Sequence, residues 1–131
     1  RVYQTNVFGA TMMGQAAAKI FKAQKSGSIV NIGSTASVKG YGKGSIYASS
    51  KFALRGLSQC WQADLRPFNV RVMHVNPSEV TTAFGKTDGE SRPEEGNKLR
   101  PKEIADVIIS QLKMDDRGFV PEVTVWATNP W

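Results

Sequence analysis

Apolar positions along the chain recur at two spacings, one typical of amphipathic helices and the other of buried strands. The helical spacing predicts three helices, over residues 7–24, 45–65 and 101–114. Short runs rich in β-branched residues predict three strands, over residues 28–33, 69–77 and 119–128. Helix and strand therefore alternate along the chain. This order predicts an α/β fold, in which right-handed crossovers join parallel strands and helices cover the faces of the sheet.

The first two predicted helices carry apolar stripes that are expected to pack against other elements. Along 7–24 the stripe consists of Phe8, Met12, Ala16, Ile20 and Ala23. Along 45–65 it consists of Ile46, Phe52, Ala53, Leu57, Trp61 and Leu65. The first helix is also rich in Gly and Ala, which would let another backbone approach it closely.

Two loops follow the ends of predicted strands and mark the expected place of a binding site. Parallel sheets bind ligands beyond the carboxyl ends of their strands. The loops that begin at Ser34 and Pro77 are therefore the candidates. Residues 78–100 are polar and Gly-rich, with no long apolar run, and are expected to form a mobile excursion outside the core.

Length and composition are those of one soluble globular domain of 131 residues, 40% hydrophobic and 21% charged. No apolar stretch approaches the ~20 residues that span a bilayer, and the first residues lack the pattern of a signal peptide. Cys60 is the only cysteine, which excludes a disulfide framework or a cysteine-based metal site. A reducing, cytoplasmic location and no membrane contact are expected. The single histidine, His74, is expected to pack beside a strand rather than to bind a metal or act as a base.

The net charge is +6, from 17 basic and 11 acidic residues. The basic residues are scattered, and aromatic residues do not interleave with them as on a surface that stacks nucleic-acid bases. We therefore expect no nucleic-acid partner. The charge is interpreted as solvated surface, with an anionic cofactor or an acidic partner as the secondary interpretation.

The stretch SIYASSKFALRG places Tyr47 and Lys51 four residues apart, on one face of the predicted second helix. An ammonium group held near a phenol stabilises the phenolate, which suits the pair to proton transfer near neutral pH. Taken alone, the pair is equally compatible with a solvated helix face. Only small residues, Ala48, Ser49 and Ser50, separate the two, and they are expected to leave that face open.

Two further features of the loop that begins at Ser34 bear on a site. Ser34 follows a predicted strand, where its hydroxyl would either face a ligand or cap a turn. The stretch GYGKGS fails the phosphate-loop pattern, since Lys43 is followed by Gly44, and its glycines do not match G-x-G-x-x-G. It is interpreted as a flexible loop.

Taken together, these residues resemble the short-chain dehydrogenase/reductase family. The matching motifs are Asn6 in TNVFG, Ser34 in VNIGSTAS thirteen positions before Tyr47, and Tyr47 with Lys51 in YASSK. The stretch NVRVMHVNPSEVTT is similar to the family's strand and its P-G-x-V-x-T turn. It supplies Pro77, Val80 and Thr82, but Ser78 stands where glycine is usual.

The resemblance implies an NAD(P)-dependent oxidoreductase, with NADP favoured over NAD. Tyr47 would be the general acid or base, Lys51 would stabilise the tyrosinate and bind the nicotinamide ribose, and Ser34 would hold the substrate oxygen. Asn6 would organise a water linked to Lys51. Pro77, Val80 and Thr82 would lie at the nicotinamide, and residues 78–100 would form a substrate lid. No metal is implied.

The resemblance also implies partners. The substrate would be a small carbonyl compound or alcohol, and the protein would be a homo-oligomer. The ending GFVPEVTVWATNP is similar to bacterial 3-oxoacyl-carrier-protein reductases, so an acyl-carrier-linked substrate is among the candidates.

The Gly-rich turn that binds the dinucleotide pyrophosphate in this family has no counterpart in residues 1–131. The chain therefore resembles the carboxyl-terminal half of a doubly wound Rossmann-like sheet, a single partial domain with the last three of seven strands. Alone it is expected to be inactive. Two alternatives remain: an epimerase or dehydratase of the extended branch, which also uses Tyr-x-x-x-Lys, and a non-catalytic packing or oligomerisation module built on helices 7–24 and 45–65.

Overall fold

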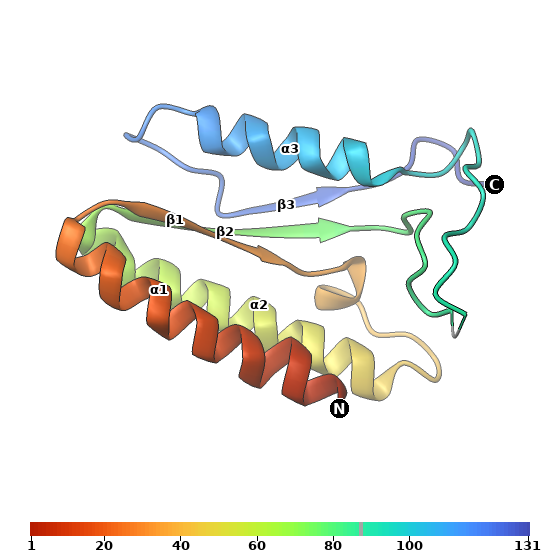
Figure 1. The fold of residues 1–131 in the computed structure, drawn as a ribbon, viewed down its shortest axis with the longest axis horizontal. Coiled ribbons are helices and arrows are strands. Elements are labelled where there is room, and N and C mark those ends of the chain that lie inside the picture. The colour runs from red at the N-terminus through yellow and green to blue at the C-terminus, as the bar shows by residue number, and fades with distance from the viewer. Residues whose placement is uncertain (87) are drawn as a thin grey trace.

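The computed structural model describes residues 1–86 and 88–131, which form three layers (Figure 1). The middle layer is a parallel sheet in the order β1-β2-β3. Its strands are β1 (Gly27–Ile32), β2 (Val70–Pro77) and β3 (Glu122–Val125). Helices α1 (Ala10–Gln24) and α2 (Ser45–Leu65) cover one face, and α3 (Pro101–Lys113) covers the other. The alternation of helix and parallel strand confirms the predicted α/β class.

Strand register places the carboxyl ends of β1 and β2 next to each other. β1 pairs with β2 from Gly27 opposite Val70 to Ile32 opposite Val75. One further bond, from the Gly33 amide to the Val75 carbonyl (2.7 Å), carries the pairing into the loop after β1. The loops that follow Ile32 and Pro77 therefore leave the same edge of the sheet, as predicted.

The two faces of the sheet have separate apolar clusters. On the α1 and α2 face, Leu65, Val70 and Val72 are buried, with Phe21 and Trp61 packed against them. On the α3 face the buried residues are Val75, Leu99 and Ile104. Burial of these side chains is the main driving force for assembling the layers.

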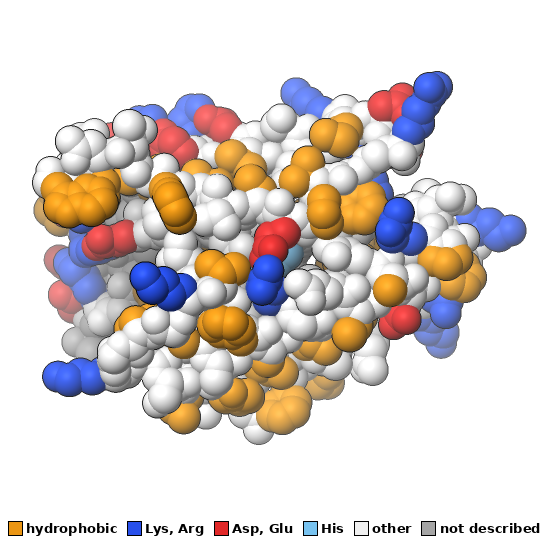
Figure 2. All heavy atoms as spheres, turned by 180° about the vertical axis from the view of Figure 1, so that it is seen from behind, with side chains coloured by type: hydrophobic (Ala, Val, Ile, Leu, Met, Phe, Trp, Pro, Cys, Tyr) orange, Lys and Arg blue, Asp and Glu red, His pale blue; other side chains and the backbone are white. Residues whose placement is uncertain are grey.

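Several residues of the apolar stripes predicted for the first two helices are exposed, although the stripes were expected to pack against other elements. Phe8 is 55% exposed, Met12 70% and Ile20 61%, and Ile46 and Phe52 on α2 are also exposed. Figure 2 shows hydrophobic side chains gathered along the lower part of the molecule, where Figure 1 places α1 and α2. α1 instead approaches α2 closely at one small residue. Gly14 is buried so closely against the Trp61 ring that a Cβ there would lie 2.3 Å from it.

The bounds of the helices and strands differ from the predicted ones mainly at β3 and before α1. β3 covers only Glu122–Val125, within the predicted 119–128, and Pro121 directly precedes it. The turn before α1 is a π-helix over Gln4–Gly9 rather than the start of a regular α-helix. α3 begins with Pro101 at its first position, and the Glu103 carboxylate accepts the Arg100 amide (2.7 Å). Among the described residues, no helix is long and apolar enough to cross a bilayer.

Replacing Gly14 with alanine should destabilise the protein although alanine is the better helix former. The new methyl group must displace the Trp61 ring, so we expect a loss of about 1–3 kcal/mol in the free energy of unfolding. The matched control is Gly56→Ala in α2, where a Cβ meets nothing within 4 Å. There the helix propensity should stabilise by about 1 kcal/mol. Urea unfolding measures both, and equal stabilisation by the two variants would contradict the close α1–α2 contact.

Candidate active site

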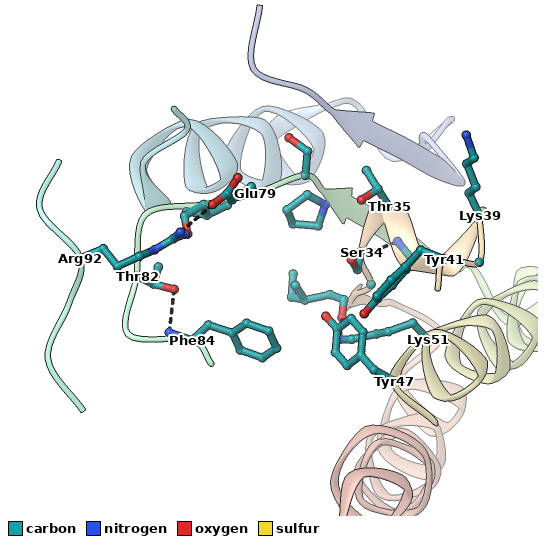
Figure 3. A pocket seen from close by; sticks show the side chains of 17 residues that line it. Ser34, Thr35, Lys39, Tyr41, Tyr47, Lys51, Glu79, Thr82, Phe84 and Arg92 are labelled. Carbon is teal, nitrogen blue, oxygen red and sulfur yellow. Dashed lines mark hydrogen bonds and ion pairs between the residues drawn. The ribbon is translucent and has the colours of Figure 1, made fainter. Parts of the chain in front are cut away.

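A cleft of about 630 Å³ lies at the carboxyl ends of β1 and β2 (Figure 3). Six of the seven site residues predicted from the sequence line it, and they come from three segments: Ser34, Tyr47, Lys51, Pro77, Val80 and Thr82. Asn6, the seventh, does not line the cleft. The fold thus brings the hydroxyl, phenol and ammonium groups of Ser34, Tyr47 and Lys51 to one cleft with the segment that follows Pro77.

Lys51 is anchored beside Tyr47 by the end of β1. Its Nζ donates to the Ile32 carbonyl oxygen (2.9 Å) and lies 5.8 Å from the centre of the Tyr47 ring. Burial lowers the pKa of the Lys51 ammonium from its usual 10.5, because desolvation disfavours the charged form. One bond to a carbonyl leaves the ammonium with two further protons to donate.

Ser34 caps the short 3₁₀-helix Thr35–Ser37, and its side chain also borders the cleft. Its Oγ accepts the Ala36 amide (3.1 Å), while its own amide donates to Ser37 Oγ (3.1 Å). The capping interpretation is therefore confirmed, and a role of this hydroxyl toward a ligand stays a prediction. The cap fixes the oxygen, and accepting a bond leaves the hydroxyl proton available for donation.

Asn6 contacts α2, the helix that carries Tyr47 and Lys51, on the side away from the cleft, and its predicted link to Lys51 through a water stays a prediction. Its Nδ2 donates to Ser50 Oγ (3.1 Å), which in turn donates to the Tyr47 carbonyl oxygen (2.7 Å). Nearby, the Tyr3 hydroxyl donates to Ser49 Oγ (2.7 Å).

The small residues between Tyr47 and Lys51 have a different purpose from the predicted one. They were expected to leave the helix face open, and Ser49 is exposed, but Ala48 and Ser50 are buried. Their size lets α2 pack closely against the π-helical turn that carries Asn6. This corrects the explanation, while the exposure of the Tyr47 and Lys51 side chains to the cleft stands.

Two aromatic residues of the cleft were not identified from the sequence. The Phe84 ring lies 5.7 Å from the Tyr47 ring, tilted by 51°. Tyr41 packs on the first residues of α2, where a Cβ on Gly44 would come within 2.4 Å of its ring. The glycines of GYGKGS suggested only a flexible loop, yet Gly44 is the residue that admits the Tyr41 ring. An aromatic residue within a Gly-rich segment is the signal that could have indicated this.

The segment after Pro77 is tied down at its base by a carboxylate that bridges two cations. Glu79 forms ion pairs with Arg92 and with Lys98 (3.2 Å), and Arg92 Nη2 also donates to the Val80 carbonyl (2.9 Å). Hydrogen bonds from Arg92 and then Lys98 hold the pKa of the Glu79 carboxyl below its usual 4.5. Thr81, whose amide and hydroxyl both reach the Leu99 carbonyl, is buried, so the excursion contributes to the core at this point.

The sequence of this chain is similar to a known protein family and to curated proteins. The profile of a family described as short chain dehydrogenase matches residues 1–93. The chain is 29% identical over 95% of its length to an NADP-dependent 3-hydroxy acid dehydrogenase of Schizosaccharomyces pombe, and 32% identical over 95% to a sepiapterin reductase of Chlorobaculum tepidum. It covers 51% and 50% of these two proteins, so it spans about half the length of the curated relatives it matches.

Solved structures of dehydrogenases and reductases have a fold similar to that of this chain. An alcohol dehydrogenase from the archaeon Thermococcus sibiricus, complexed with 5-hydroxy-NADP, superimposes with a TM-score of 0.83 at 26% identity, over 94% of this chain and 51% of that one. A betaketoacyl-ACP reductase from Bacteroides thetaiotaomicron superimposes with a TM-score of 0.79 at 25% identity, over 96% and 52%. The three-stranded sheet and its helices are thus half of a fold seen in larger reductases and dehydrogenases.

We expect acid to weaken the anchoring of residues 78–100, because protonation of the Glu79 carboxylate removes its ion pairs with Arg92 and Lys98. Because its folded-state pKa is depressed, the anchoring is complete above pH 4.5 and is lost as the pH falls through the lower folded value. Glu79→Gln should therefore raise hydrogen exchange in residues 80–98 at pH 7 and remove its acid dependence, after correction for intrinsic rates. Glu95→Gln is the control, since Glu95 forms no ion pair among the described residues. Equal protection in the Glu79→Gln protein and the parent would disprove the anchoring role.

Proposed function

Because the chain belongs to the short-chain dehydrogenase family, we propose that the full-length protein is an NAD(P)-dependent oxidoreductase that reduces a carbonyl group or oxidises an alcohol. The observation that supports this most directly is the meeting of Ser34, Tyr47 and Lys51 at one cleft. These are a hydrogen-bond donor, a proton-transfer group and a cation, which suits a reaction in which a carbonyl oxygen gains a proton.

The residues beside Lys51 fit the nicotinamide end of such a cofactor. Lys51 has donors to spare beyond its bond to Ile32, and ribose hydroxyls are suitable acceptors. Pro77, Val80 and Thr82 line the same cleft and would hold the ring. When bound, the nicotinamide supplies or accepts the hydride.

Each polar residue of the cleft has a separate task in this proposal. Tyr47 donates its phenolic proton to the substrate oxygen during reduction and takes it back during oxidation. Lys51 stabilises the resulting phenolate, and Ser34 orients the substrate oxygen through its hydroxyl. Asn6 keeps the first turn of α2 in place through Ser50, which bonds the Tyr47 carbonyl.

The cleft favours an uncharged substrate with an apolar body. Tyr41 and Phe84 offer aromatic surface beside Tyr47. The Arg92 guanidinium at its rim is engaged by Glu79, and Figure 3 shows Lys39 pointing away from the centre. A substrate carboxylate would thus meet few free cations, so we propose a small ketone or the corresponding alcohol. An acyl-carrier-linked substrate stays a prediction.

NADP is the cofactor we favour, since relatives of this chain are described as NADP-dependent or were solved with an NADP derivative. The exposed apolar residues of α1 and α2 support assembly into a homo-oligomer. A cytoplasmic location remains a prediction from the sequence.

Replacing Tyr47 with phenylalanine in the full-length protein should remove most carbonyl reduction and leave cofactor binding nearly intact. Loss of the proton donor should lower kcat about 100- to 10,000-fold. Tyr41→Phe is the matched control, because it deletes the same atom from the other tyrosine of the cleft. Turnover is measured under chemistry-limited conditions. More than half of the parental rate in the Tyr47→Phe enzyme would refute the assignment.

Residues 1–131 alone should bind NADP or NAD poorly even when folded. Dinucleotide affinity in doubly wound folds comes largely from a Gly-rich turn and the helix that follows it, which these residues do not contain. Calorimetric titration of the isolated chain with each cofactor is the direct measurement. Micromolar affinity for either would show that the chain has a complete cofactor site, contrary to the proposal.

A further inference from the structure

A row of polar side chains crosses the sheet directly behind the cleft. Strand register aligns Asn31 on β1 with His74 on β2, and His74 with Glu122 on β3. All three lie on the face covered by α2, which offers Arg55, Ser58 and Gln62 at helical spacing. A hollow of about 220 Å³ on this face is lined by Arg55, His74 and Glu122, among other residues.

Side chains at both ends of this row form hydrogen bonds. At one end Asn31 Nδ2 donates to Ser58 Oγ (2.9 Å), and that oxygen lies 2.9 Å from His74 Nδ1. At the other end Arg55 binds both oxygens of Glu122 (2.6 and 3.0 Å), and Asn76 Nδ2 donates to Glu122 Oε1 (3.0 Å).

The middle of the row contains two buried atoms, His74 Nε2 and Asn76 Oδ1, that have no hydrogen-bond partner among the described residues. They converge on Gly33. A Cβ at Gly33 would lie 2.2 Å from His74 Nε2, 2.6 Å from Asn76 Oδ1 and 2.7 Å from Ser37 Oγ. These polar side chains therefore occupy the space that a side chain at position 33 would need. Position 33 directly precedes Ser34.

The chemistry of the ends determines where the histidine proton lies. The Glu122 carboxylate accepts hydrogen bonds only, so the Asn76 amide must turn its nitrogen toward Glu122 and its oxygen toward His74. That oxygen can only accept, so a proton on the nearby Nε2 avoids placing two acceptors against each other. Nδ1 is then the acceptor and takes the Ser58 hydroxyl proton, which would otherwise go to the Leu54 carbonyl at the same 2.9 Å.

We propose that His74 is a positioning residue for the cleft: a neutral imidazole that accepts from Ser58, directs a proton on Nε2 toward the Asn76 side of Gly33, and packs against Gly33 so that Ser34 and the Ile32 carbonyl are held in place. Ser37, which touches the same space, bonds the Ser34 amide, and the Ile32 carbonyl holds Lys51. Its effect on catalysis rests on the proposed function, whereas the proton placement does not.

The surroundings favour the neutral ring at physiological pH. Burial lowers the pKa of the His74 imidazole from its usual 6.5. The nearby charged groups partly oppose one another, since Glu122 raises this pKa and Arg55 and Lys51 lower it.

The first test is the tautomer of His74, measured by long-range proton–nitrogen correlation on the full-length protein at pH 7. Residues 1–131 contain one histidine. The signals of its ring are assigned as those that disappear in a His74→Gln protein. We expect the proton on Nε2. A proton on Nδ1 alone, or on both nitrogens, would overturn the proposal.

The second test separates positioning from general stability. His74→Gln can place an amide N–H near Nε2 and should retain most of kcat. His74→Asn can reach only the Nδ1 position and should lose about 10- to 100-fold in kcat, with KM for the cofactor changed less. In a Ser34→Ala background the His74→Asn loss should largely disappear, because residues that act as one unit are non-additive. A full, additive loss in that background would contradict positioning through Ser34.

The outcomes distinguish the two proposals. If Ser34→Ala alone leaves turnover unchanged, the function proposed for Ser34 fails, and the tautomer measurement still tests the structure of the row. If Ser34→Ala abolishes most turnover but the tautomer is wrong, the enzyme assignment survives and the positioning role does not.

Discussion

The parallel pairing of β1 with β2 is the constraint on which the rest of the structure depends. It fixes where both strands end, and a bond from Gly33 to Val75 extends the alignment to the residue before Ser34. α2 connects the strands on one face and carries Tyr47 and Lys51 back to the same edge. A slip of this register by one residue would turn every side chain of a strand to the opposite face.

The two faces of the sheet are stabilised by different physics. Toward α3 the contacts are apolar, and packing of Val75 and Ile104 requires no specific partner atoms. Toward α2 the apolar cluster around Val72 gives way near the cleft to polar side chains whose hydrogen bonds have direction. Directional bonds hold atoms more narrowly than apolar contact does, and they occur where the proposed chemistry needs fixed positions.

Local sequence signals were sufficient for much of this arrangement. The boundaries of α2 and β2 follow from apolar spacing, Pro67 and Pro77, and six of the residues that line the cleft follow from the motifs that resemble the family. What could not be predicted depends on tertiary partners. A helical stripe such as Phe8 and Met12 shows which residues share a face, but not whether the sheet or solvent meets it. The alignment of Asn31, His74 and Glu122 depends on strand register, which no single strand encodes.

The alignment of three strands in this row also has an evolutionary consequence. Asn31, His74 and Glu122 are separated by more than forty residues at each step in the sequence, yet they share neighbours: Ser58 contacts both Asn31 and His74, and Asn76 donates to Glu122. A neutral residue at 122 would leave Arg55 and the Asn76 amide without their acceptor, and reversing that amide would then require the other histidine tautomer. Descendants of this chain should therefore exchange these positions together, as a single inherited unit, rather than one at a time.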